Sequence, residues 1–108
     1  MVVLDMLLVN IDSIQTIFKD VKSFSEKEHD LKIIINYLDK LPISFLSVGY
    51  EAVSMVLALK DLEEGDELKS WSCFMEQHGS NHSVQVHIGL GWAFSQKRKS
   101  PDNYLNYL

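Results

Sequence analysis

The segment Ala52-Val-Ser-Met-Val-Leu-Ala-Leu59 has a single polar residue, Ser54. It belongs to a longer stretch, from about residue 42 to residue 62, which opens with Pro42. Proline suits the first turn of a helix, because the N–H that it lacks would have no partner there. A helix that is apolar on all sides is buried in the centre of a fold. The stretch therefore predicts a central buried helix over about 42–62, and Gly65 is the expected left-handed residue that ends it.

Helical patterns on both sides predict further helices around this one. Apolar residues recur at spacings of three and four near the N-terminus, which predicts an amphipathic helix. These residues are Leu4, Leu7, Ile11, Ile14, Phe18 and Val21. Ser25-Glu-Lys-Glu28 has the form of a capping box and predicts the start of a second helix. Asp66 is expected to cap a fourth helix that carries Trp71, and Ser100-Pro101 to open a last short one.

The segment from His82 to Gln96 has two interpretations. Apolar residues alternate with period two over positions 84–92, as in a strand. No other segment alternates in this way, so a strand would lack a partner, and isolated strands are not stable. As a helix, the segment places Gly89 and Ala93 on one face, where another helix backbone can approach closely. We therefore expect an all-α fold, a single domain over 1–108 with five or six antiparallel-paired helices.

Composition limits the classes of function. The chain has 108 residues, 10 of them basic and 15 acidic, which gives a net charge of -5. This charge disfavours nucleic acid or an anionic membrane as a partner. The single cysteine excludes an internal disulfide framework. The sequence contains no run of about 18 uninterrupted apolar residues, so no membrane-spanning segment is expected. The N-terminus is a poor signal peptide. We expect a cytoplasmic protein without a cofactor.

Three titratable residues are candidates for chemistry. Glu51 precedes the apolar run, and partial burial there would raise its pKa and suit it to acid/base work. The alternative is a solvated carboxylate near a helix N-terminus. His82 and His87 lie in a stretch without fixed charge, but five residues apart on a helix they face different directions. That spacing disfavours a shared metal ion, and a structural His87 bonded to a neighbouring group is the alternative to a functional one.

Aromatic residues gather in the second half of the chain, and they are expected to fill a core or an interface rather than a ligand pocket. The group consists of Trp71, Phe74, Trp92 and Phe94. The sequence has no Gly-rich phosphate loop, no Gly-x-Ser-x-Gly turn and no evident Cys/His nucleophile pair. The motifs therefore name no reaction, and no metal site is predicted.

Three motifs stand out: Gly49-Tyr-Glu-Ala-Val-Ser-Met55, Ala58-Leu-Lys-Asp61 and His82-x-x-x-x-His87-Ile-Gly-Leu-Gly-Trp-Ala93. They resemble a bacterial family of unknown function whose members occur in gene clusters for enediyne natural products. The resemblance extends over about residues 15–108 and implies a biosynthetic setting without a mechanism. Ala52 stands where the family has glycine, and family members are longer, as if this chain were a fragment or one half of the family domain. The matching positions are Tyr50, Glu51, Met55, Asp61, His82, His87, Gly89, Gly91, Trp92 and Ala93.

Two hypotheses about function follow. The first is a non-catalytic helical module that binds another protein or itself, which fits the short chain and the apolar residues at 104–108. The second is an enzyme or small-molecule-binding protein of secondary metabolism. In it the central helix and the 82–96 helix would cross at small residues and bring Glu51 to His87, so that the pair could relay a proton. We favour the first hypothesis, while substrate, partner and oligomeric state are not predictable from the sequence.

Overall fold

A computed structural model describes residues 2–65 and 67–97, with side chains from residue 12 onward. Five helices follow one another in this part of the chain: α1 (Val2–Lys27), α2 (Leu31–Asp39), α3 (Leu46–Glu64), α4 (Lys69–His78) and α5 (Ser83–Lys97). Short 3-10 turns at Ile43–Phe45 and Ser80–His82 precede α3 and α5. The described residues contain no strand, so the all-α prediction is confirmed and the strand interpretation of 84–92 is wrong.

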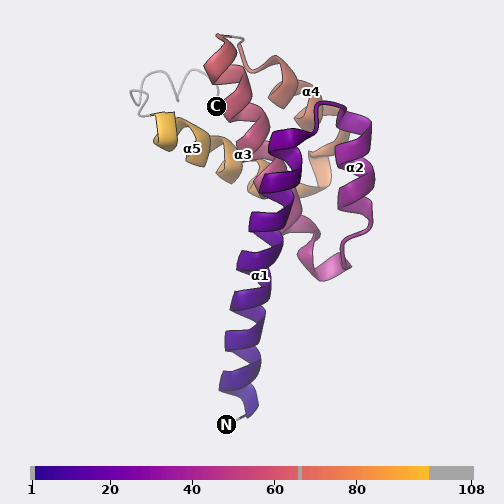
Figure 1. Cartoon of the computed structure of the whole chain (residues 1–108), viewed down its shortest axis with the longest axis vertical. Coiled ribbons are helices and arrows are strands. Elements are labelled where there is room, and N and C mark those ends of the chain that lie inside the picture. Colours follow the sequence, from indigo (N-terminus) through magenta and orange to yellow (C-terminus); the bar gives the residue numbers. More distant parts are fainter. Residues whose placement is uncertain (1, 66, 98–108) are drawn as a thin grey trace.

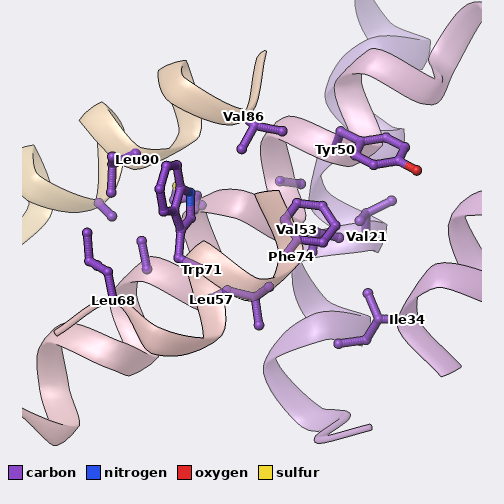
Figure 2. Close-up of a cluster of buried hydrophobic side chains, with 14 of the residues drawn as sticks. Val21, Ile34, Tyr50, Val53, Leu57, Leu68, Trp71, Phe74, Val86 and Leu90 are labelled. Atoms are coloured by element: carbon purple, nitrogen blue, oxygen red, sulfur yellow. The ribbon is translucent and has the colours of Figure 1, made fainter. Parts of the chain in front are cut away.

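α3 is the central helix. Every residue from Ala52 to Ala58 is buried, and α3 packs against each of the four other helices (Figure 1). Gly65 ends the helix in the left-handed conformation (φ 77°), and its N–H donates to the carbonyl of Asp61. Both expectations for this element, the buried centre and the glycine end, are confirmed. Figure 2 shows how side chains from the surrounding helices converge on this core, among them Ile34, Phe74 and Leu90.

The second helix starts later than its capping-box pattern predicts. α1 continues through Ser25 to Lys27, and α2 begins only at Leu31. The Asp30 carboxylate caps α2 by accepting a hydrogen bond from the backbone N–H of Lys32 at 2.9 Å. Ser25 is fully buried against the core, so tertiary burial of this helical face outweighs the local capping signal.

The C-terminal end of α1 is held by a lysine of α3. The Lys60 ammonium donates hydrogen bonds to the carbonyl oxygens of Ser25, at 2.7 Å, and of Glu28, at 3.2 Å. Carbonyls in the last turn of a helix have no partner within the helix, and a positive charge there interacts favourably with the helix dipole. The Lys60 ammonium thus gives both carbonyl oxygens a hydrogen-bond donor, and it joins the end of α1 to the central helix.

α4 receives its N-terminal cap from another helix. The predicted cap, Asp66, lies outside the described residues, as does the expected short segment from Ser100 onward. The buried carboxylate of Asp61, in α3, accepts a hydrogen bond at 2.9 Å from the backbone N–H of Trp71 in the first turn of α4. Leu68, just before α4, is buried and has a left-handed backbone (φ 51°). The start of α4 is thus fixed by tertiary contacts.

The molecule is elongated because α1 is long. Figure 1 shows the N-terminal half of α1 projecting beyond the other helices, and the longest dimension is 48 Å. Separately, the segment Ile43–Glu64 is long and apolar enough to cross a membrane by length and composition alone. About half of the most apolar part of that segment is buried inside the fold. A core helix meets the same criterion, and the position of α3 is that of a core helix.

Candidate functional site

The most extensive contact between two of the described helices is the crossing of α3 and α5. A Cβ added to Gly89 would lie 2.5 Å from the carbonyl oxygen of Glu51 and 2.8 Å from Cβ of Ser54. Only glycine therefore fits at this point without a shift of the α3 backbone. Ala93, one turn further along α5, is fully buried. The expectation that the two helices cross at these small residues is confirmed.

Ser54 links three helices at this crossing. Its hydroxyl donates a hydrogen bond to the carbonyl oxygen of Val86 in α5 and accepts one from the indole N–H of Trp71 in α4, at 2.7 Å. Ser54 and Val86 are fully buried and Trp71 nearly so, so each polar group depends on the others for its partner. The sequence offers one signal for this network: Ser54 is the single polar residue in an apolar run, and a buried polar side chain needs a hydrogen-bond partner.

His82 is held by stacking. Its ring lies 4.2 Å from the ring of Tyr50, centroid to centroid, and its Nδ1 is 3.3 Å from the hydroxyl oxygen of Ser47. Tyr50 also stacks on Phe74, at 5.5 Å. Burial, and secondarily the negative charge of Asp39, raises the pKa of the Tyr50 hydroxyl. His82 thus joins the start of α5 to α3 as part of an aromatic stack.

His87 does not meet Glu51. Its Nδ1 lies 2.7 Å from the Ser83 carbonyl oxygen, so this nitrogen carries the proton and donates, and the ring packs edge-on against Trp71 at 5.5 Å. Among the described residues no hydrogen bond or ion pair joins Glu51 to His87. Two residues apart on a helix, Gly89 and His87 point in nearly opposite directions. Because Gly89 contacts α3 at Glu51, the direct contact between Glu51 and His87 that the sequence suggested is not formed, and the spacing on the helix already indicated this.

Glu51 lines an open groove between α1, α3 and α5, with a volume of about 620 Å³. The lining residues are Ile14, Gln15, Phe18, Lys22, Ser47, Val48, Glu51, Met55, Gln85, Trp92 and Gln96. Partial burial raises the pKa of the Glu51 carboxyl, as the sequence suggested. No described residue donates a hydrogen bond or forms an ion pair with this carboxylate. The groove therefore combines apolar walls with one carboxylate that has no partner in the described part of the chain.

The aromatic group divides between the core and the groove. Trp71, Phe74 and Phe94 are buried, as expected for core residues. Trp92 is 53% exposed and lines the groove. The interpretation of the group as core is confirmed for three members, whereas the fourth lies on the surface.

Trp92 also belongs to a row of exposed apolar residues on α5, which we call the α5 stripe. The stripe consists of Val84, Ile88 and Trp92, which are 66%, 42% and 53% exposed and four residues apart. Residues at this spacing lie on one helical face. The stripe therefore forms a narrow apolar band along α5 beside the groove.

The other motif residues have structural positions. Met55 is buried, and its sulfur accepts a hydrogen bond from the side-chain amide of Gln96 at 3.4 Å. Asp61 caps α4 and Gly91 is partly exposed on α5. Within residues 2–65 and 67–97 no group of three or more His, Cys, Asp or Glu side chains could hold a metal ion.

No protein-family model, curated protein or solved structure matches the chain. The fold and the site define a small all-α protein with a buried central helix, an apolar groove and an exposed apolar stripe beside it. Function therefore has to be inferred from this geometry.

Proposed function

We propose that the chain is a non-catalytic helical module that associates with a second copy of itself through the α5 stripe. The observation that supports this is the exposure of Val84, Ile88 and Trp92 on one face of one helix. A single exposed apolar residue is ordinary on a protein surface, but a continuous band suggests an interaction site. Burying this band against a like surface removes apolar area from water and stabilises the association.

The charge distribution is compatible with a second copy as the partner. The protein has a net charge of -5, so two copies repel each other over most of their surfaces. α5 has no Asp, Glu, Lys or Arg between Ser83 and Gln96. Two α5 helices can therefore meet without like charges in direct contact, and only the long-range repulsion of the net charges opposes them.

The stripe is also complementary to itself. In an antiparallel pair with the two-fold axis at Ile88, Val84 of one copy faces the partner's Trp92, so that a small side chain meets a large one. Three side chains bury less than the roughly 800 Å² per partner of a standard interface. We therefore expect a weak dimer, with a dissociation constant on the order of 0.1 mM.

Sedimentation equilibrium over concentrations on either side of that value tests the proposal. The wild type should shift from monomer to dimer, and Ile88→Ser should remain monomeric throughout. Ile33→Ser in α2 is the matched control, because Ile33 is 44% exposed and Ile88 42%. A wild type that stays monomeric, or an Ile88→Ser variant that dimerises as well as the control, would contradict the proposal.

For the biological setting we keep the likeness to the enediyne-cluster family as a proposal. The likeness is supported by the packing of the motif at 49–55 on the motif at 82–93: Tyr50 stacks on His82, and Gly89 contacts Glu51. Enediyne biosynthetic genes beside the coding gene would support this setting, and their absence would count against it. A cytoplasmic location is part of the same proposal, since a single cysteine cannot form the internal disulfides that are common in small secreted proteins.

The alternative function, an enzyme that uses a Glu51–His87 pair, has no support in the geometry. His87 donates to the Ser83 carbonyl and packs on Trp71, while Glu51 lines the groove. A general base must lie within hydrogen-bond reach of its partner, directly or through one water.

A further inference from the structure

The groove between α1, α3 and α5 has the size and composition of a small-molecule site. Its volume of about 620 Å³ lies within the range of roughly 300–1,000 Å³ that is usual for ligand pockets. Ile14, Phe18, Val48 and Met55 form apolar walls, and Trp92 stands at the surface. Sites of this kind combine apolar walls with a few polar groups that orient the ligand.

The main polar group in the groove is the carboxylate of Glu51. It is partly buried, and no described residue forms a hydrogen bond or an ion pair with it. A charge that is removed from water without a partner is costly, and a ligand that supplies an opposite charge offsets this cost. Because no described residue pairs with the Glu51 carboxylate, the groove favours a ligand with a cationic group close to it.

Among the described residues, Lys22 is the only other charged one that lines the groove, and its position does not reverse this preference. A lysine side chain is long and flexible, and its ammonium can reach water while the stem covers apolar surface. The Glu51 side chain is shorter than that of lysine. Its backbone is held at the crossing of α3 and α5, because its carbonyl oxygen lies against Gly89. Glu51 therefore has less freedom than Lys22 to recover solvent.

We propose that this groove binds an amphipathic amine, a small molecule with an apolar body and one ammonium group that pairs with Glu51. The side-chain amides of Gln15 and Gln85, which also line the groove, can donate to or accept from polar atoms on such a ligand. The inference goes beyond self-association: the groove shares Trp92 with the α5 stripe, but the ammonium is assigned to Glu51, which is not part of the stripe. Each of the two proposals can therefore fail without the other.

Intrinsic fluorescence provides a direct assay. Trp92 is 53% exposed at the groove, whereas Trp71 is 6% exposed in the core, so a bound ligand should change mainly the emission of Trp92. The probes are phenylbutylamine, phenylbutanol and phenylbutyrate, which share one apolar body and differ in charge. We expect the amine to bind the wild-type protein about fivefold more tightly than the alcohol, the effect of one partly exposed ion pair, and the carboxylate to bind most weakly.

Two charge variants test the assignment of the ammonium to Glu51. Glu51→Gln should bind amine and alcohol equally, to within about twofold, because the ion pair is lost while the shape is kept. Lys22→Gln should keep or increase the preference for the amine. Circular dichroism checks whether both variants are folded, and Ile88→Ser should bind the amine as the wild type does.

The opposite pattern would overturn the proposal. Equal binding of amine and alcohol by the wild type, tightest binding of the carboxylate, or a preference for the amine that survives in Glu51→Gln would each exclude the proposed pairing. The same holds if none of the probes changes the emission of Trp92 at concentrations up to about 10 mM, which corresponds to negligible affinity.

Discussion

Replacement of Gly89 by alanine tests the close contact between α3 and α5. In most helix interiors this change is stabilising, because alanine has the highest helix propensity and glycine costs about 1 kcal/mol more. At Gly89 the new methyl group would lie 2.5 Å from the carbonyl oxygen of Glu51 and 2.8 Å from Cβ of Ser54. The atom in the way belongs to the backbone of the central helix, so no rotation of a side chain can relieve the overlap.

The magnitude follows from these two opposing effects. Overpacking of a tight core costs about 1–3 kcal/mol, and a fixed backbone atom places Gly89→Ala near the upper end. After the gain of about 1 kcal/mol in helix propensity, we expect a net loss of about 2 kcal/mol in the free energy of unfolding. For a domain of this size, that loss lowers the melting temperature by roughly 10 °C.

Gly49→Ala and Ser95→Ala provide the comparison. A Cβ at Gly49 would lie 2.7 Å from terminal methyl carbons of Leu38 and Leu41, which can move more easily than backbone, so its cost should be smaller. Ser95 is exposed on α5, and its replacement should change the stability by less than about 0.5 kcal/mol. Urea denaturation followed by circular dichroism gives all three values. If Gly89→Ala is as stable as the wild type, or less costly than Gly49→Ala, the reasoning about the crossing is wrong.

Three further outcomes are expected. Ser54→Ala should cost about 1–3 kcal/mol in urea denaturation, because the indole N–H of Trp71 loses its acceptor and the Val86 carbonyl loses a donor; a loss below about 0.5 kcal/mol would contradict the network. Asp61→Ala should lower the free energy of unfolding by about 1–2 kcal/mol, also measured by urea denaturation, and Asp61→Asn should lower it less, since asparagine can still cap α4. Equal losses in the two variants would argue against capping. Burial raises the pKa of the Glu51 carboxyl in the folded state, so the folded state binds the proton more tightly than the unfolded chain does. The free energy of unfolding should therefore fall as pH rises from the unfolded pKa through the raised folded pKa, and the difference between wild type and Glu51→Gln should show this fall. A difference that does not change with pH would contradict the effect of burial.

Where local pattern and tertiary packing agree, the sequence was sufficient to predict the structure. The apolar run Ala52–Leu59 required burial on every side, and Gly65 was a suitable end, so α3 could be placed within a few residues. Gly89 and Ala93 marked the face of α5 that packs on α3. Both features depend on residue size and polarity, which can be read without coordinates.

The predictions failed where a distant residue decides the outcome. The capping-box pattern at Ser25 is local, but the end of α1 depends on burial and on Lys60, which is 35 positions away. The groove around Glu51 needs three helices in a particular arrangement, which no single pattern contains. The proposed pair with His87 failed for a different reason, because it conflicted with the helical face already assigned to Gly89.

The central position of α3 also affects how the protein can come apart. Each outer helix packs more extensively on α3 than on any other helix, so each can detach without removing the main support of the rest. α2 has less contact with α3 than α1, α4 or α5 have, so its departure exposes the least of the surface of the central helix. Disorder of α3, in contrast, removes the common surface of all four, so partial opening at the periphery and complete loss of structure are separate events in this fold.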